Sequence, residues 1–300
     1  MGKNESRKFV SRQYLIQILL TVFFLFLLVW NTLAFSQNSD SNFIPVDSVT
    51  KTQPWGKFSV NLGGIFSGYS GAVTIGSEQL GLGLAVDVER LLGLSVSSWG
   101  LKGTTQIRIG KKNRSMLYLS YFGVQRKSTK VLEKELEIAD IVIPINTSIT
   151  SRFNWNIFQL KYDYSFYQDD RVSLGASIGL YILPISFSIE IENQKGTAQS
   201  VFAPLPILGF RSDFLVSQKF LFHQKVDFLY LSANGFVGSI LDFDFSIEYR
   251  PIKHFGLGLG INTVKWQLSS DGSDYPGVDF YGDMEAGYTG FYAFAKYILY

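Results

Sequence analysis

Long runs of alternating apolar and polar residues are the feature that most constrains the fold of this chain. In IFQLKYDYSF, residues 157–166, one face is apolar and largely aromatic, while the other carries Gln159, Lys161, Asp163 and Ser165. Residues 172–182 and 241–250 alternate in the same way. A period of two places all the apolar side chains on one face of a β-strand. The chain is therefore predicted to be all-β.

The length of these strands favours a membrane barrel over a soluble sandwich. Asn156–Tyr167 and Arg171–Leu183 are about twice as long as a typical globular strand of ~5–6 residues. They match the ~9–11 residues that a tilted strand needs to cross a bilayer. Their polar faces are rich in Gly, Ser and Ala, which suits a packed interior, and their apolar faces are aromatic near the ends, as at a bilayer interface.

Short and long connections alternate along the chain, as they do in outer-membrane barrels with short periplasmic turns and long external loops. The predicted strands are 57–67, 99–110, 115–126, 151–166, 171–183, 205–216, 222–234, 240–250, 254–267 and 287–300. We therefore predict a transmembrane antiparallel up-and-down β-barrel of ten strands. Residues 73–94 also alternate, and could add a hairpin, making twelve strands, or form a loop folded over the mouth.

The first 36 residues have the pattern of an export signal. Residues 1–14 are basic, residues 15–30 are almost wholly apolar, and Ala34 and Ser36 occupy the positions that a signal peptidase reads. An uncleaved anchor helix is the alternative. Residues 37–56 are polar and aperiodic, which predicts a short periplasmic tether before a barrel at 57–300. The predicted location is the outer membrane of a Gram-negative-type bacterium.

Composition excludes several classes of function. The chain has no cysteine, two histidines and a formal net charge of +2. It has no disulfide or thiol chemistry, a zinc site is not expected, and the charge gives no electrostatic case for nucleic acid. His223 and His254 are predicted at periplasmic turns, as solvated residues. We predict no catalytic, cofactor-binding or metal site, and a protein that is not an enzyme.

The most informative polar residues share the inward parity of their strands and carry both signs of charge. This predicted lumen charge network consists of Lys161, Asp163, Arg211, Asp213, Lys225, Asp227, Asp242, Asp244, Glu248 and Arg250. The acids are expected to pair with Lys161, Arg211, Lys225 or Arg250. Two interpretations remain open: an ion-pair network that fills a narrow barrel, or a narrow polar path. GLGLG at 256–260 is predicted to make room for neighbouring bulky side chains in the lumen, not to bind phosphate.

Over Lys57–Tyr300 the chain resembles the small bacterial outer-membrane β-barrel families. The resemblance rests on the export signal, the alternating strands and the terminal aromatic residue. It implies that the barrel-assembly machinery recognises the last strand and that membrane lipid surrounds the barrel; the oligomeric state stays open. The residues that match the assembly signal, predicted to face lipid, are Tyr292, Phe294, Ile298 and Tyr300. Lys296, on the same face, departs from the pattern and is expected to reach the headgroups.

Three functions from different classes are compatible with such a barrel. The first is a structural role, or transport of a small solute or hydrophobic ligand. The second is a surface adhesin or receptor that acts through an external hairpin at 126–150. The third, a membrane-embedded hydrolase or acyltransferase, is disfavoured because both histidines are predicted at the periplasmic rim.

Three prolines lie near the predicted outer edge of the membrane. Pro184 follows the strand 171–183, and Pro204 and Pro206 open the strand 205–216. Because proline has no N–H, the ladder between these two strands is expected to be weakened there. Pairing could simply end at the rim, or the gap could be a lateral opening for an apolar molecule or lipid chain.

Overall fold

The computed structural model describes residues 54–75, 84–87, 93–132, 136–138, 141–191, 194–233, 236–271 and 281–300. The predicted signal peptide at 1–36 and all but the last three residues of the predicted tether lie outside these ranges. Within the described part of the chain, no helix is long and apolar enough to span a membrane.

The described residues form strands connected in sequence order. They are β1 (Phe58–Ile75), β2 (Leu84–Asp87), β3 (Ser97–Ile109), β4 (Ser115–Val131), β5 (Leu136–Ile138), β6 (Ile141–Ile143), β7 (Ser148–Gln168), β8 (Val172–Ile191), β9 (Gln194–Leu215), β10 (Phe220–Ala233), β11 (Phe236–Ile252), β12 (Phe255–Asp271) and β13 (Tyr281–Leu299). Ten of them close into one ring, in the order β1-β3-β4-β7-β8-β9-β10-β11-β12-β13, because β13 pairs with β1 from Phe58↔Leu299 to Ile75↔Gly282. The predicted ten-stranded antiparallel barrel is confirmed.

The remaining strands lie outside the ring. β2 pairs only with the far end of β1, from Ala72↔Asp87 to Ile75↔Leu84, so the twelve-stranded alternative is wrong. β5 and β6 form a separate two-stranded sheet within the predicted external hairpin. Beside it, β4 and β7 stay paired as far as Val131↔Ser148, so the barrel wall continues into this hairpin, as the alternation predicted.

Four connections, each of five residues or fewer, gather at one end of the barrel. We call the end with the short connections 110–114, 169–171, 216–219 and 253–254 the turn end, and the opposite end the loop end. Gly110 and Asn113 take positive φ angles of 86° and 52°, which suits a tight turn. In the next turn, Asp169 Oδ1 accepts the N–H groups of Arg171 and Val172, both at 2.7 Å. Burial acts to raise the pKa of Asp169, but its hydrogen bonds outweigh that effect and lower the pKa.

The apolar faces of the strands point outward and the polar faces point inward. On β7, the outward Phe158 is 43% exposed, whereas the inward Lys161 and Asp163 are each 3% exposed. Outward apolar residues of the same kind recur on β1, β9, β12 and β13. A continuous apolar outer surface of this extent is typical of a barrel that faces lipid. The chain therefore has the architecture of a membrane barrel.

The predicted register of the last strand is wrong. Tyr292, Phe294 and Ile298 point into the barrel and are buried, and Lys296 is 5% exposed rather than directed to the headgroups. The outward set is instead Phe291, Ala293, Ala295, Tyr297 and Leu299. The larger aromatic rings were taken for the lipid face. They lie inside because the neighbouring strand β12 presents glycines there and leaves room for them.

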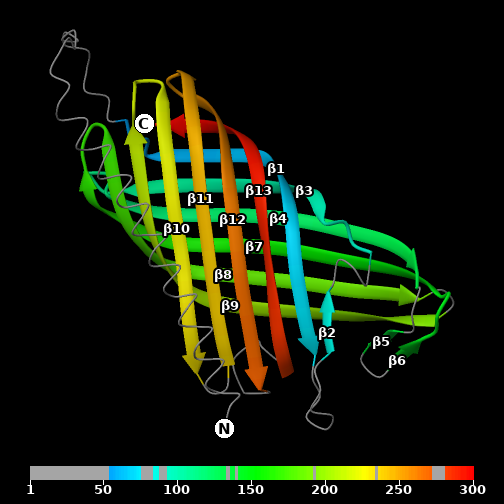
Figure 1. The fold of residues 1–300 in the computed structure, drawn as a ribbon. Coiled ribbons are helices and arrows are strands. Elements are labelled where there is room, and N and C mark those ends of the chain that lie inside the picture. The colour runs from blue at the N-terminus through cyan, green and yellow to red at the C-terminus, as the bar shows by residue number, and fades with distance from the viewer. Residues whose placement is uncertain are drawn as a thin grey trace, which may run out of the picture. The chain divides into compact units, whose positions relative to one another are not determined.

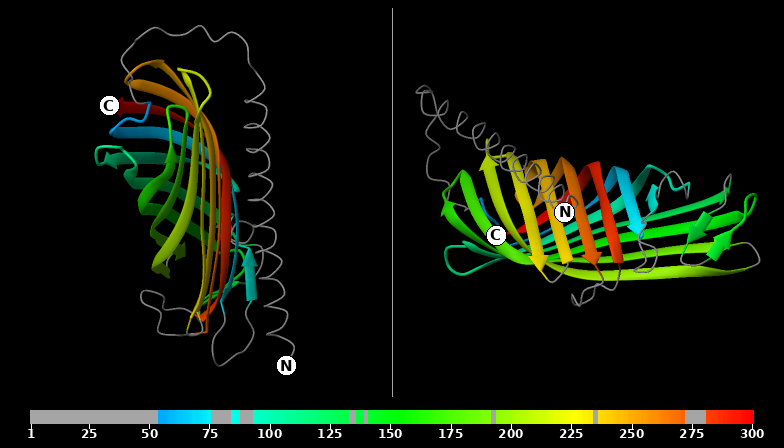
Figure 2. Two further views of the ribbon diagram at one scale, coloured as in Figure 1. Left: turned by 90° about the vertical axis from the view of Figure 1, so that its left-hand side faces the viewer. Right: turned by 60° about the horizontal axis from the view of Figure 1, so that its bottom comes forward.

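The walls separate between β9 and β10 toward the loop end. Figure 1 shows β9 following β8 while β10 follows β11, and Figure 2 shows the same divergence from two further directions. The pairing of β9 with β10 runs from Leu215↔Leu221 and stops at Leu208↔Phe228. Both strands continue beyond that point. At this seam the barrel wall is thus continuous only in its turn-end part.

Candidate functional site: the barrel lumen

The lumen is divided along the barrel axis into a charged half and an apolar half. On β10 the inward residues after Leu221 at the turn end are His223, Lys225 and Asp227, followed by Leu229 and Leu231. β7, β9 and β11 repeat this order, with charged residues near the turns and apolar residues toward the loops. The interior therefore offers two different chemical environments.

All ten residues of the predicted charge network lie inside the turn-end half. Arg211 joins two acids: its Nη2 donates to Asp163 Oδ1 at 2.8 Å, and its Nη1 contacts Asp213. Ser165 accepts a further hydrogen bond from Nη2, at 2.9 Å. Arg108 Nη2 lies 3.9 Å from Asp213 Oδ2 on the other side. Each buried charge in this layer is thus compensated by an opposite one, as a low-dielectric interior requires.

A second layer lies nearer the middle of the barrel. Lys161 Nζ donates to both oxygens of Asp227, at 2.8 and 2.7 Å, and both side chains are almost fully buried. Lys225 Nζ lies 3.4 Å from Asp242 Oδ2. The same Asp242 oxygen also accepts a hydrogen bond from the Tyr181 hydroxyl at 2.9 Å. These contacts join β7, β8, β10 and β11 within the lumen.

Glu248 is the acid with the most partners near the turn end. Its Oε2 accepts from Lys296 Nζ at 2.9 Å and contacts His223 Nε2 at 2.8 Å, while its Oε1 accepts from Arg250 Nε at 2.5 Å. His223 Nδ1 contacts Asp213 Oδ1, at 2.8 Å, and so connects the two acids. The expectation that His223 is a solvated turn residue is wrong, because it lies inside β10 with its side chain largely buried.

Sequence reasoning missed Arg126, which is buried toward the loop end. It also missed four charged residues in the turn-end half: Lys102, Arg108, His223 and Lys296. Asp244 pairs with Lys102 of β3 rather than with one of the four predicted bases. The signal was present for three of them. Lys102 and Arg108 share a parity with Thr104 and Gln106, and His223 shares one with Lys225. Lys296 was missed because the inward face of the last strand was predicted to face lipid.

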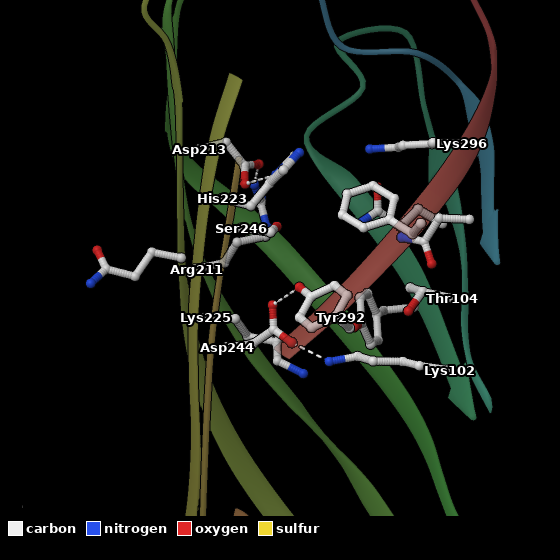
Figure 3. Close-up of a pocket in the computed structure, with 15 residues that line it drawn as sticks. Lys102, Thr104, Arg211, Asp213, His223, Lys225, Asp244, Ser246, Tyr292 and Lys296 are labelled. Carbon is white, nitrogen blue, oxygen red and sulfur yellow. Dashed lines mark hydrogen bonds and ion pairs between the residues drawn. The ribbon is translucent and has the colours of Figure 1, made fainter. Parts of the chain in front are cut away.

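The cavity between these layers is small. It has a volume of about 60 Å³, which is room for a few water molecules. Figure 3 shows its walls: Lys102 and Tyr292 both contact Asp244, and Asp213 and His223 lie together on the opposite side. The Tyr292 hydroxyl donates to Asp244 Oδ1 at 2.7 Å. Among the described residues, no group of three or more His, Cys, Asp or Glu side chains could hold a metal ion.

The end of the predicted tether closes the turn end of the lumen. Trp55 is 4% exposed, and its Nε1 donates to the carbonyl oxygen of Asp169 at 2.7 Å. Arg108 lies over its ring, 5.6 Å from the centroid. Arg250 Nη1 donates to the carbonyl oxygen of Pro54 at 3.1 Å. We call Pro54–Gly56 the strap, because it is fixed by contacts with different parts of the rim.

The glycines of β12 are inward, as predicted for GLGLG. A Cβ atom on Gly258 would lie 2.1 Å from Phe294 Cζ, and one on Gly260 would lie 2.5 Å from Tyr292 Cζ. A Cβ atom on Gly256 would likewise lie 3.0 Å from Glu248 Oε1. These glycines make room for side chains that form the polar cavity.

The loop-end half of the lumen is lined mainly by aromatic and aliphatic side chains, with Arg126 over the rings of Tyr69 and Phe153. Phe122 and Tyr288 stack at 4.3 Å between ring centroids, and Trp155 meets Trp266 edge-on at 6.0 Å. Both tryptophans are buried, and neither indole N–H has a hydrogen-bond partner among the described residues. A buried donor without a partner costs free energy, so two of them in one apolar chamber require an explanation.

The lateral opening predicted between the strands now named β8 and β9 is wrong. Their pairing continues without a register shift from Val172↔Phe214 to Ile189↔Thr197, past all three prolines. The pairs Leu180↔Pro206, Ile182↔Pro204 and Pro184↔Phe202 belong to this ladder. Proline can occupy a non-hydrogen-bonded pair of an antiparallel ladder, because the backbone N–H at such a position points to the other neighbouring strand.

Comparisons with known proteins return barrels of several kinds. No protein-family model matches the chain, and no characterised protein matches its sequence. Among solved structures, the outer membrane protease OmpT from Escherichia coli aligns at 11% identity, over 84% of this chain and 99% of that one, with a TM-score of 0.47. The attachment invasion locus protein Ail of Yersinia pestis aligns at 11% identity, over 80% and 98% of the chains, with a TM-score of 0.34.

The toluene transporter TodX of P. putida is a further match, at 8% identity over 80% of this chain and 89% of that one, with a TM-score of 0.32. The three names describe a protease, an attachment protein and a transporter. At this level of similarity they do not indicate which function this chain has.

Proposed function

We propose that this protein is a closed outer-membrane barrel with a structural role, which anchors an extended β-sheet outside the membrane and does not conduct ions. The filled lumen carries this proposal. Ion pairs cross it at two levels, the strap lies beneath them, and the loop-end half is packed with buried aromatic side chains. A chain that transports ions or polar solutes through its lumen needs an open path, and ten strands leave little space for one.

The strands next to the seam are longer than a membrane requires. β7, β8 and β9 contain 21, 20 and 22 residues. At a rise of ~3.3 Å and a tilt of ~40°, each residue climbs ~2.5 Å along the axis, so ~20 residues climb ~50 Å. The apolar band of an outer-membrane barrel is only ~25 Å tall. About half of this three-stranded wall is therefore available outside the membrane.

Membrane orientation can be tested by cysteine labelling, because the chain has no cysteine of its own. Ile145, near the external hairpin, and Lys253, in a short turn, are both exposed. We expect a membrane-impermeant maleimide to label Ile145→Cys on intact cells and to label Lys253→Cys only after the outer membrane is opened. The two variants serve as controls for each other. Labelling of Lys253→Cys on intact cells would reverse the proposed orientation.

Planar-bilayer recording tests the absence of conductance. We expect the refolded mature protein to show no steady single-channel current, because buried ion pairs and the strap block the lumen in series. Trp55→Ala removes the strap's side chain but leaves the ion pairs, so it is expected to stay silent as well. An open porin in the same bilayer is the positive control. Steady current steps from the unaltered barrel would exclude the structural proposal.

A receptor or adhesin role is the second candidate. It is favoured by the continuation of β4 and β7 into the predicted external hairpin, where Val131 and Ile145 are both exposed. Exposed apolar residues at the edge of an external sheet are typical of surfaces that bind a partner. Deletion of residues 133–143 is the direct test: loss of host-cell or ligand binding with unchanged barrel folding would favour this candidate.

A further inference from the structure

The seam between β9 and β10 opens where two prolines interrupt its hydrogen bonds. Along an antiparallel strand, successive N–H groups point alternately to the two neighbours. Pro204 and Pro206 both take part in the unbroken ladder with β8, so their ring nitrogens must face β10. The last β9–β10 pair is Leu208↔Phe228, and the next two hydrogen-bonding positions on β9 are these prolines. Because proline has no N–H, β9 cannot donate backbone hydrogen bonds to β10 at these two positions.

Pro184 supports this assignment independently. It also lies in the β8–β9 ladder, so its missing N–H must face β7. The pairing of β7 with β8 skips that position: it stops at Trp155↔Ile185 and resumes at Phe158↔Ile182 in the same register. Beside Pro184, two residue pairs are missing from the β7–β8 ladder, and pairing is present on both sides of this gap. At the β9–β10 seam, no pair follows the prolines among the described residues.

Among the described side chains, aliphatic residues of both strands line the inner side of this seam. Leu205 and Ile207 of β9 are almost fully buried. Leu229 and Leu231 of β10 are partly buried and contact the same apolar cluster. Side-chain packing holds this part of the wall together, whereas backbone hydrogen bonds also hold the paired parts. The seam is thus the part of the described wall that is easiest to open.

A similar separation on the other side of the barrel is covered. β3 begins at Ser97, so the loop-end parts of β1 and β4 are not bridged by it. The chain before Ser97 fills this space: Leu94 is buried, and Tyr69 N–H donates to the carbonyl oxygen of Val96 at 2.8 Å. Arg126 Nη1 donates to the carbonyl oxygen of Ser95 at 3.3 Å. Among the described residues, no such segment covers the β9–β10 seam.

With the loop end outward, as proposed above, the seam begins at the level of the outer leaflet. Leu208 is eight residues from the connection 216–219, which places it ~20 Å above the turn end at ~2.5 Å per residue. This is near the upper edge of an apolar band that is ~25 Å tall. The molecules next to the seam are therefore lipids, at the depth where acyl chains join their ester carbonyls.

The chamber behind the seam has polar groups that match such a ligand. Leu229 pairs with Ile240, and Ile240 pairs with Trp266. These inward residues therefore form a row along the inner wall, from the seam to Trp266. The indole N–H groups of Trp266 and Trp155 are buried and have no hydrogen-bond partner among the described residues. An aliphatic chain would be compatible with the leucine-lined entry, and a carbonyl oxygen would satisfy an indole donor.

We propose that the β9–β10 seam is a lateral entry site for one aliphatic chain bearing a carbonyl group, which inserts between Leu205, Ile207, Leu229 and Leu231 toward Trp266. The ligand is an acyl chain, supplied either by a membrane lipid as its ester or by a free fatty acid. This site does not depend on the proposed structural role, because it needs no path through the charged half.

Quenching of tryptophan fluorescence by brominated acyl chains tests the site. The mature protein carries Trp55→Phe and Trp99→Phe, which leaves Trp155 and Trp266 as reporters. One arm uses vesicles whose own lipids are brominated, and the other adds a free brominated fatty acid to unlabelled vesicles. We expect quenching in at least one arm, and the arm that quenches identifies the source. No quenching beyond that of a sealed barrel, in either arm, would overturn the proposal.

The sealed barrel is made by replacing Pro204 and Pro206 with threonine, which restores both backbone donors. Hydrogen exchange at Tyr230 and Ser232 reports whether the ladder has closed. Where it has not, Pro206→Cys with Tyr230→Cys is joined by a short bis-maleimide. We expect either closure to remove most of the quenching, and Pro184→Thr, the matched control on the other side of β8, to leave it unchanged. Equal quenching in open and closed barrels would overturn the proposal.

The indole donor gives a separate readout. Trp266→Phe keeps the aromatic ring but removes the N–H, with Trp155 as the remaining reporter. We expect it to weaken binding of the brominated fatty acid about five-fold, equivalent to ~1 kcal/mol, and to leave binding of a brominated alkane unchanged. An equal effect on both probes would exclude the hydrogen bond to the ligand and leave only an apolar entry, contradicting the proposed ligand class.

Discussion

Replacing Glu248 with glutamine is expected to destabilise the barrel by about 3–5 kcal/mol, the usual effect of breaking a buried ion pair. Glu248 is fully buried and accepts from Lys296, Arg250 and His223. Glutamine keeps the shape but removes the charge, so two buried cations lose their shared counter-charge. Urea unfolding of the refolded barrel in vesicles, followed by tryptophan fluorescence, measures the change in the free energy of unfolding.

The matched control is Glu190→Gln at the loop end. Glu190 forms an ion pair with Arg152, but both side chains are 40% exposed or more. An exposed pair contributes only ~0–1 kcal/mol, so this variant should unfold close to the original protein. Similar unfolding of Glu248→Gln and Glu190→Gln would mean that the lumen network is hydrated and contributes little to stability.

The ten-stranded architecture could be predicted because lipid imposes a strict rule on the chain. Every strand that crosses the membrane must pair on both sides and present an apolar face outward. The alternation in 157–166 indicates a membrane strand, and the polar residues around Asp169 are typical of a tight turn. The structure has a strand and a turn at these positions. Long-range partners could not be predicted in the same way. Asp244 contacts Lys102 across 142 residues of sequence, and no local pattern specifies that pair.

The prolines show how a correct local signal can be assigned to the wrong contact. Pro204 and Pro206 were rightly expected to weaken pairing at the outer edge of the membrane. A proline removes a hydrogen bond only on the side to which its N–H would have pointed. The sequence alternation does not tell which of the two neighbouring strands is on that side until the pairing with one of them is known. The structure gives that ladder, β8–β9, and thereby moves the weakness to β9–β10.

The last strand shows a limit of reasoning from side-chain size. Tyr292 and Phe294 are large and aromatic, but they lie inside because Gly260 and Gly258 of β12 stand opposite them. Its outward face includes Ala293 and Ala295, which are apolar but small. In a barrel with an aromatic lumen, both faces of a strand can be apolar, and only the residues across the ladder distinguish them.

Ala295→Arg tests this corrected register. Ala295 points outward and lies four residues from Leu299, ~10 Å above the turn end, which is near the middle of a ~25 Å apolar band. An arginine on the lipid face at the midplane costs ~2–4 kcal/mol. We expect a loss of stability of that size in urea unfolding, together with a lower yield of heat-modifiable, folded barrel.

Leu299→Arg is the control for depth. It lies on the same outward face at the turn-end edge of the band, where the arginine head group reaches the interface and the cost falls to ~0–1 kcal/mol. The difference between the two variants isolates the effect of the lipid from that of an added charge. If Ala295→Arg is no more destabilising than Leu299→Arg, then Ala295 does not face the membrane, and the register that places Lys296 beside Glu248 is incorrect.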